Sequence, residues 1–271
     1  MGSKGAAMPR LNFLLTLAWD GTDFEGWQRQ PGRVRSVQLC IEAALSKVLA
    51  EPVEVTGASR TDKGVHAEGQ ALSFHSRSPM PPASILAALD RELPPDLAAL
   101  TLRTVDPRFH ARYRAKSKLY RYRLYLADRP NPLLRRYSHH VTGILDLVAM
   151  REAAALLAGE RDFRKLSNEK EKSDTVRRLL AARVEARRCE GGLAGAAIEE
   201  ATTRGPAIVD LLFEGDGFLH NQVRIMSALV LEAGLGKRSL ESVGQLLAAG
   251  GRQDAPGALG AWGLTLLSVS Y

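Results

Sequence analysis

The sequence predicts an α+β fold with two similar domains, each a mainly antiparallel sheet with helices on one face. In several short segments every second residue is apolar, which is typical of strands with one buried face. Other segments repeat apolar residues every three or four positions after a capping residue, which indicates helices. Both kinds of segment occur in each half of the 271 residues, so we expect two layered domains.

The first half contains three predicted strands and two predicted helices. One helix is expected to begin after an N-cap at Ser36 and to end at Pro52, because serine caps helix starts and proline cannot continue a helix. The other runs from Ala83 to Leu93, before Pro94-Pro95. The strands are expected over residues 11–19, 53–57 and 70–75.

The second half repeats this mixture, beginning with the alternating segment SKLYRYRLYL. Asp146 is the expected N-cap of a helix from Leu147 to Leu157. Solvated loops are expected over residues 166–175 and 189–206. We place the domain boundary between Thr104 and Ala115 and predict domains over residues 1–107 and 108–271. Further strands are expected over residues 117–126, 179–187, 207–215 and 264–271, and further helices over about 219–233 and then 240–249.

The charge of the chain favours a polyanionic partner. There are 37 basic and 30 acidic residues, which gives a net charge of +7 and a pI near 9.6. Basic residues are concentrated between Arg103 and Arg136, and Tyr113, Tyr120, Tyr122 and Tyr125 lie among them. Cations neutralise phosphates and aromatic rings stack on unpaired bases, so this segment indicates an RNA site. A merely solvated, charged strand is the alternative.

Several function classes are disfavoured by what the sequence lacks. No stretch of 18 apolar residues is present, and the N-terminus has no apolar leader, so we expect a cytoplasmic protein with no membrane contact. Cys40 and Cys189 are too far apart in the sequence to suggest a disulfide framework or a zinc site. His139-His140 has no further ligand at metal spacing. Phosphate-binding and dinucleotide-binding loops are absent too, so we expect neither a metal nor a cofactor.

The segment GASRTDKGVHAEGQ, from Gly57 to Gln70, carries the candidate chemistry. Asp62 is expected in a loop between two strands, where catalytic groups are commonly presented. Arg60 could hold the carboxylate ionised and aim it, and the glycines allow unusual backbone angles. His66 could act as acid or base, although a lone histidine is more often structural. Glycosidic bond chemistry, general base catalysis and covalent catalysis remain open, as does a simple turn or surface ion pair.

This segment resembles the signature G-x-[GS]-R-T-D-x-G-V-H-A-x-x-Q of the TruA-type tRNA pseudouridine synthases. Further similar motifs follow the same order along nearly the whole chain. They are WDGTDFEGWQRQ at residue 19, SVQ at 36, FHARYRAKSKLYRYRLY at 109, GERDFRKL at 159, GDGFLHNQVRIM at 215 and APGALGAWGLTL at 255. The resemblance implies the pseudouridine synthase fold, with an active-site cleft between the two domains, and an enzyme that isomerises uridine in tRNA without a cofactor.

The resemblance also implies roles for particular residues. Asp62 would be the catalytic carboxylate, and Arg60 would pair with it and fill the base stack when the uridine swings out. Tyr120 would stack on the uracil and relay a proton. Arg224 would line the site, with His220 on the same helix face, and Leu264 would pack under the base. His66 is expected to bind substrate or support the site. RNA contacts are expected from Arg29, Arg112, Arg114, Lys116 and Lys118.

Substrate and assembly are also implied by the resemblance. The expected targets are uridines of the tRNA anticodon stem-loop, at tRNA positions 38 to 40, and the expected assembly is a homodimer. Two departures bear on the choice of RNA: DFRKL stands where the family often has DFxSF, and the segment from Cys189 to Pro206 is longer than a tight hairpin. The alternatives are a synthase of the same fold that acts on another RNA and a noncatalytic RNA-binding or folding-assistant protein.

Overall fold

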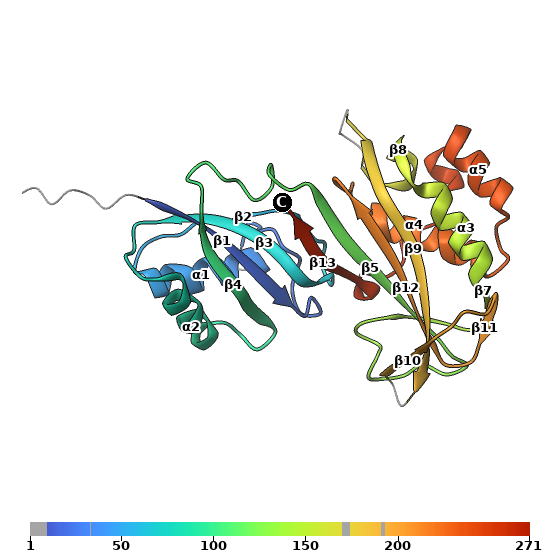
Figure 1. The fold of residues 1–271 in the computed structure, drawn as a ribbon, viewed down its shortest axis with the longest axis horizontal. Helices are drawn as coiled ribbons and strands as arrows, with labels where there is room; N and C mark the ends of the chain where they lie inside the picture. Colours follow the sequence, from blue (N-terminus) through green and yellow to red (C-terminus); the bar gives the residue numbers. More distant parts are fainter. Residues whose placement is uncertain (1–9, 33, 170–173, 191–192) are drawn as a thin grey trace, which may run out of the picture. The chain divides into compact units, whose positions relative to one another are not determined.

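The structure is a computed structural model, and it describes residues 10–32, 34–169, 174–190 and 193–271. The chain divides into two compact units (Figure 1). The first comprises Met1–Ala115 and Tyr271, and the second comprises Lys116–Ser270. Both units combine antiparallel strands with helices, so the predicted α+β class is confirmed.

The sheet of the first unit is built around β1 (Leu11–Trp19), a strand that the sequence predicted. It pairs antiparallel with β3 (His66–Ser76) on one side and with β4 (Leu97–Val105) on the other. Phe13, Leu15 and Leu17 are fully buried, which places the apolar face of β1 in the core. β4 was missed by the sequence pattern because most of its outer residues are exposed and weaken the alternation.

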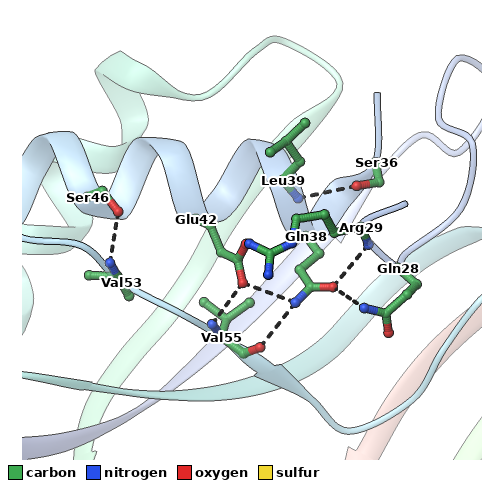
Figure 2. Close-up of polar contacts among 9 residues, drawn as sticks. All are labelled: Gln28, Arg29, Ser36, Gln38, Leu39, Glu42, Ser46, Val53 and Val55. Atoms are coloured by element: carbon green, nitrogen blue, oxygen red, sulfur yellow. Dashed lines mark hydrogen bonds and ion pairs between the residues drawn. The ribbon is translucent and has the colours of Figure 1, made fainter. Parts of the chain in front are cut away.

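The strand predicted over residues 53–57 is reduced to β2 (Thr56–Gly57), which pairs with β3. In the rest of the segment Val53 and Val55 are apolar and buried. Their backbone N–H groups, however, donate to helix side chains and not to a neighbouring strand. Val53 N–H donates to Ser46 Oγ at 2.9 Å, and Val55 N–H donates to a Glu42 carboxylate oxygen at 3.1 Å (Figure 2). Helix side chains therefore replace the strand ladder here.

Two helices complete the first unit. α1 (Val37–Leu49) begins after Ser36, whose hydroxyl accepts from Leu39 N–H at 3.3 Å, as predicted. It ends at Ala50 in a left-handed conformation, two residues before Pro52. α2 (Pro82–Glu92) starts with a proline in its first turn, where the missing N–H costs no hydrogen bond.

The second unit has a larger antiparallel sheet in the strand order β10-β9-β12-β5-β13. The long strand β9 (Val176–Glu190) extends the predicted strand at both ends. Short strands that were not predicted join its edges and β5. The predicted strands of this sheet are β5 (Ser117–Leu126), β12 (Ala207–Gly215) and β13 (Leu264–Ser270). The strands that were not predicted are β10 (Leu193–Ala197), β8 (Gly159–Asp162) and β6 (His139–Val141).

The helices of the second unit pack beside this sheet (Figure 1). α3 (Leu147–Leu157) has the predicted bounds, and Asp146 caps it by accepting from Ala149 N–H at 2.9 Å. α4 (Gln222–Gly234) and α5 (Leu240–Ala249) follow. Short 3₁₀ turns lie at η1 (Arg164–Leu166), η2 (Arg252–Asp254) and η3 (Ala261–Gly263).

The start of α4 corrects one prediction. The helix was expected from Leu219, but Asn221 has φ of 59° and precedes the first helical residue, Gln222. His220 is therefore outside the helix and exposed. The prediction that His220 shares a helix face with Arg224 is wrong, because a left-handed residue interrupts the helical spacing.

The prediction of a solvated loop over residues 189–206 is also wrong for part of that segment. It contains β10 and β11 (Thr202–Arg204), and β11 pairs with β7 (Ile144–Asp146) in a separate small sheet. Ile198 and Thr203 are buried. The alanine and glycine content of the segment suggested a loop, but β11 forms by pairing with β7, which lies more than 50 positions earlier in the chain. In the other predicted loop, residues 170–173 lie outside the described residues, and Ser167 and Thr175 beside them are buried.

Residues 108–115 are grouped with the first unit, whereas the sequence assigned them to the second domain. Hydrogen bonds account for this grouping. Asn12 Nδ2 donates to the carbonyl oxygens of Asp106 and Phe109 at 2.9 and 2.8 Å. Ala111 N–H donates to Ser73 Oγ at 3.1 Å. The segment is thereby attached to β1 and β3.

Candidate active site

Asp62 lies in a tight turn in the loop between β2 and β3, as the sequence predicted. Val65 N–H donates to the carbonyl oxygen of Asp62 at 3.2 Å and closes the turn. Gly64 stands at its third position with φ of 79°, a conformation that glycine adopts without steric cost. The Asp62 side chain is half-buried. The turn therefore presents the carboxylate on a constrained backbone.

Two glycines from the segment after β1 press against this turn. A Cβ atom at Gly26 would stand 2.8 Å from Thr61 O and 3.2 Å from the carbonyl carbon of Asp62. One at Gly21 would collide with the carbonyl of Val65. Two backbone hydrogen bonds join the same segments: Trp27 N–H to Thr61 O at 3.0 Å and Gly64 N–H to Phe24 O at 3.4 Å. The Asp62 turn is thus clamped by the residues of the WDGTDFEGW motif.

The flanks of the turn are held as well. Ala58 N–H donates to Ala71 O at 2.8 Å, and the side chain of Gln70 donates to Ser59 O at 2.6 Å. Gln70 is fully buried and Thr61 is 8% exposed. In the part of the chain that the structure describes, Gln70 Oε1 and Thr61 Oγ1 have no hydrogen-bond partner. Buried polar atoms of this kind are uncommon.

His66 is buried at the start of β3 and faces the end of β1. Gly21 N–H donates to His66 Nδ1 at 3.0 Å, and Asp20 Oδ1 lies 3.2 Å from the same nitrogen. Nδ1 cannot accept from Gly21 and donate to Asp20 together. We favour the acceptor role, because the backbone donor is fixed and Asp20 Oδ1 already accepts from Thr22 N–H and Oγ1–H.

A polar network ties the GWQRQ segment to α1 (Figure 2). Gln38 Oε1 accepts from Gln28 Nε2 at 2.7 Å and from Arg29 N–H at 3.0 Å. Gln38 Nε2 donates to Glu42 at 3.0 Å, and the Arg29 guanidinium pairs with Glu42 at 3.1 Å. The Arg29 side chain is 52% exposed and that of Glu42 is 7% exposed. Arg29 therefore has a structural partner and also a solvent-exposed face.

Arg60 is exposed two residues before Asp62. Lys63, next to Asp62, pairs with Glu25. Both cations lie within two residues of Asp62 in the sequence, and the exposure of Arg60 leaves it accessible to a polyanion.

In the second unit, Tyr120 is buried on β5. It lies opposite Phe213 of β12 and Leu266 of β13. Its ring meets the edge of Phe218 at a centroid distance of 5.2 Å and an interplanar angle of 83°. Phe218 was not singled out by the sequence, although it lies in the GDGFLHNQ motif.

Arg224 is held at the start of α4 by two hydrogen bonds. Its Nε donates to Leu259 O at 2.6 Å, and one terminal nitrogen donates to Asn221 Oδ1 at 2.7 Å. The Tyr122 hydroxyl donates to Gly260 O at 2.8 Å. Burial raises the pKa of Tyr122, and the nearby charge of Arg224 opposes that rise. Arg224, Tyr122 and the segment around Gly260 therefore form one cluster.

Leu264 is part of the same neighbourhood. It is 6% exposed and lies opposite Tyr122 in the β5–β13 ladder. Tyr120 and Tyr122 are two residues apart on β5, and cross-strand partners share a face of the sheet. The structure therefore places Tyr120, Leu264 and the tyrosine beside Arg224 on one face of the second unit's sheet.

The remaining basic residues have different environments. Arg112, Arg114 and Lys116 are exposed, and Lys118 is half-buried on β5. Tyr120, Tyr122 and Tyr125 are 5%, 0% and 8% exposed, whereas Tyr113 is 78% exposed. The sequence grouped these four tyrosines as base-stacking candidates. Burial leaves little ring surface open at Tyr120, Tyr122 or Tyr125, so Tyr113 is the surface ring of the group.

Among the residues that the structure describes, no group of three or more histidine, cysteine, aspartate or glutamate side chains lies close enough to hold a metal ion. Within the same residues, no helix has the length and apolarity needed to span a membrane.

A clamped aspartate turn on an α+β scaffold presents a carboxylate as catalytic loops do, and the exposed cations in the same unit favour a polyanionic ligand. Comparison with known proteins defines the family. Residues 17–114 and 153–271 match the family profile described as "tRNA pseudouridine synthase". The chain therefore belongs to the tRNA pseudouridine synthase family, whose members isomerise uridine in tRNA to pseudouridine, and it is an isomerase.

Individual relatives agree along nearly the full length. A tRNA pseudouridine synthase A 2 from Bacillus cereus is 35% identical over 261 residues, which cover 96% of this chain and 99% of that protein. A tRNA pseudouridine synthase A from Syntrophotalea carbinolica is 38% identical over 258 residues, with 95% of each chain covered. A tRNA pseudouridine synthase A from Geobacter sulfurreducens is 37% identical over 257 residues, which cover 95% of this chain and 98% of that protein. The family resemblance seen in the sequence motifs is confirmed.

Proposed function

We propose that this isomerase uses Asp62 as its catalytic carboxylate. The geometry that supports this role is the clamp on its turn. Gly21, Gly26 and Trp27 contact the backbone on both sides of Asp62, and a catalytic group must be held in a defined position to react efficiently. Family membership supplies the reaction, and the clamp favours this aspartate over the exposed acidic residues nearby.

The reaction exchanges bonds within one nucleoside. The bond between N1 of uracil and C1′ of ribose breaks, the uracil turns, and a bond forms between C5 and C1′. The proton of C5 is then lost and N1 gains a proton, so atoms and electrons balance without an external oxidant or reductant. Asp62 either adds to the nucleoside covalently or promotes elimination, and both routes need an ionised carboxylate at the reacting sugar or base.

The other proposed residues have supporting roles. Tyr120 stacks on the uracil and relays a proton through its hydroxyl, with Phe218 against its ring. Arg224 lines the site, and its two hydrogen bonds hold its orientation. Leu264 packs under the base. His66, buried against Gly21 N–H, supports the Asp62 turn as a positioning residue.

Arg60 is proposed to interact with Asp62 in the resting enzyme and to fill the stack that the flipped uridine leaves. Its exposure supports access to RNA, and base flipping costs a few kcal/mol that such contacts offset. Phosphate contacts are proposed for Arg29, Arg112, Arg114, Lys116 and Lys118. A net charge of +7 supports this electrostatic part of binding.

We further propose the uridines of the anticodon stem-loop, tRNA positions 38 to 40, as the targets. We also propose a homodimer that works in the cytoplasm. These proposals follow from the resemblance of the motifs to the family. Mapping pseudouridines in the tRNA of a deletion strain tests the target positions, and light scattering on the purified protein tests the dimer.

The experiment for Asp62 is the Asp62→Asn variant, assayed on unmodified tRNA transcripts with pseudouridine-specific carbodiimide labelling. We expect product formation to fall to background, because the amide cannot serve as the ionised carboxylate. Affinity for tRNA is expected to stay within about threefold of the wild type, because phosphate contacts come from other residues.

Asp23→Asn is the matched control. Asp23 is exposed in the segment that clamps the turn, so the variant removes the same charge without touching the proposed chemistry. It is expected to retain wild-type turnover. Equal activity of Asp62→Asn and wild type would exclude the proposed role, and absence of product from the wild type itself would favour a noncatalytic RNA-binding protein.

A further inference from the structure

His110 and Tyr113 form an aromatic pair on the surface of the first unit. Their ring centroids are 4.2 Å apart and their planes are inclined by 26°, so the rings are stacked. Tyr113 is nevertheless 78% exposed. One face of the tyrosine ring rests on the imidazole, and the large exposed area lies on the rest of the ring.

The imidazole beneath Tyr113 is held by the backbone. Arg112 N–H and Tyr113 N–H both point to His110 Nδ1, at 3.2 and 3.3 Å. Nδ1 is therefore the acceptor, and the proton of the neutral ring lies on Nε2. Arg114 N–H donates to His110 O at 3.0 Å and closes one helical turn. These bonds orient the pair before any ligand arrives.

The turn itself is attached to the sheet of the first unit. Ala111, which is fully buried, donates its N–H to Ser73 Oγ of β3 and accepts from the Tyr271 hydroxyl at 3.0 Å. The ring of Phe109 packs against Tyr271 at a centroid distance of 5.0 Å. An exposed aromatic side chain on such a fixed base loses little conformational entropy on binding.

The charge around the pair indicates the ligand. Four cationic side chains within nine residues are exposed: Arg108, Arg112, Arg114 and Lys116. A stacking ring surrounded by cations is the combination that binds single-stranded nucleic acid, since the ring takes an unpaired base and the cations take its phosphates. An apolar protein partner would not need this density of positive charge.

We propose that the His110–Tyr113 pair is a docking site for an unpaired RNA base, separate from the base that reacts. Ser73 lies seven residues along β3 from His66, and the irregularity between Ala67 and Gln70 keeps their separation somewhat below the roughly 23 Å of a regular strand. The pair therefore holds a nucleotide remote from the target uridine. The inference rests on the proposed function in taking RNA as the ligand of this chain.

Binding and single-turnover measurements with the full-length protein test this proposal. Tyr113→Ala is expected to raise the Kd for an unmodified tRNA transcript by about five- to a hundredfold, the range for loss of one stacked base. Tyr113→Phe keeps the ring and is expected to bind like the wild type. The rate of pseudouridine formation at saturating protein is expected to stay within about twofold in both variants, because the pair is remote from the reacting base.

Salt dependence separates stacking from charge. For Tyr113→Ala the slope of log Kd against log salt is expected to equal that of the wild type. For the double variant Arg112→Gln/Arg114→Gln the slope is expected to fall by about two, one for each phosphate contact. A smaller slope of log Kd against log salt for Tyr113→Ala than for the wild type would contradict the stacking role.

Two further outcomes would overturn the proposal. One is that Tyr113→Ala binds tRNA with the affinity of the wild type. If that variant also has a lower oligomeric state than the wild type, the ring makes a protein contact instead. The other is equal weakening by Tyr113→Phe, which would exclude ring stacking. If the affinities and salt slopes of the wild type and the variants for tRNA are as expected but no pseudouridine forms, the proposed catalytic function fails and this docking site stands.

Discussion

At the scale of single residues, Gly26 shows how a position without a functional group can constrain the backbone of another residue, here the proposed catalytic Asp62. Its φ of 94° is a left-handed conformation that disfavours any side chain. In addition, a Cβ there would stand 2.8 Å from Thr61 O, directly beside Asp62. Gly26 is thus required both for its own turn and for the close approach of two backbones.

We predict that Gly26→Ala will abolish most turnover while leaving the second unit folded, because the added methyl group must displace the Asp62 turn. Gly32→Ala is the matched control. Gly32 has a similar φ of 86°, but a Cβ there has no described atom within 4 Å. This variant is expected to cost about 1 kcal/mol of backbone strain and to retain activity. Steady-state turnover on tRNA, with thermal unfolding of both proteins, checks the difference, and similar activities would disprove the clamp.

Sequence reasoning predicted a role for Asp62 but none for Gly26, and the reason is physical. Asp62 carries a charge in a glycine-rich segment between two strands, and both signals are local. The importance of Gly26 depends on contact with a turn 35 residues later. A glycine in a loop is too common to indicate such a contact by itself.

At the scale of elements, Glu42 organises the packing of α1 against the segment after it. Its buried carboxylate accepts from Val55 N–H and from Gln38 Nε2 and pairs with Arg29 (Figure 2). The apolar spacing of the segment 53–57 predicted a strand, but the carboxylate takes a donor that a strand ladder would use. A side chain from a neighbouring helix thus decided the backbone conformation.

We predict that Glu42→Ala will destabilise the protein by about 2 to 4 kcal/mol, because Val55 N–H and the Gln38 amide lose a buried acceptor. Lys47→Ala, on the same helix, removes the more exposed pair with Glu92 and is expected to cost less than about 1 kcal/mol. Urea unfolding of both variants measures the difference. Comparable losses would show that the network contributes no more than a surface ion pair.

The elements that were predicted well have local signals. α3 has its expected bounds because a capping aspartate defines its start, and β12 has its expected bounds because Gly205-Pro206 and Gly215 bound a largely apolar run. β4 and β11 were missed because their residues are largely exposed or lie in an alanine- and glycine-rich segment. Their conformation depends on pairing with β1 and β7, which a local pattern does not report.

At the scale of the whole molecule, the first unit is built from both ends of the chain. Tyr271, the last residue, is grouped with residues 1–115. Its hydroxyl donates to Ala111 O at 3.0 Å, and its ring packs on Phe109. Burial raises the pKa of Tyr271, so the hydroxyl keeps its proton and can donate this bond.

We predict that Tyr271→Ala will lower the stability of the first unit by about 2 to 3 kcal/mol through lost ring packing and an unsatisfied carbonyl. Tyr271→Phe keeps the ring and is expected to lose about 1 kcal/mol. Hydrogen exchange of the β1 and β3 amides reports on the first unit, and the β9 and β12 amides serve as an internal reference. Equal protection of β1 and β3 in the wild type and Tyr271→Ala would contradict this role.

The sequence by itself determined the family, the reaction class and the α+β architecture, because ordered motifs, alternating strands and capped helices are all written in local residue order. It also placed Asp62 in a loop between strands. Only the tertiary structure decided which tyrosines are buried, which glycines clamp the aspartate turn and which unit residues 108–115 join. These outcomes depend on strands and loops that are distant in sequence coming together, so solvent exposure and close backbone contacts exist only in the folded chain.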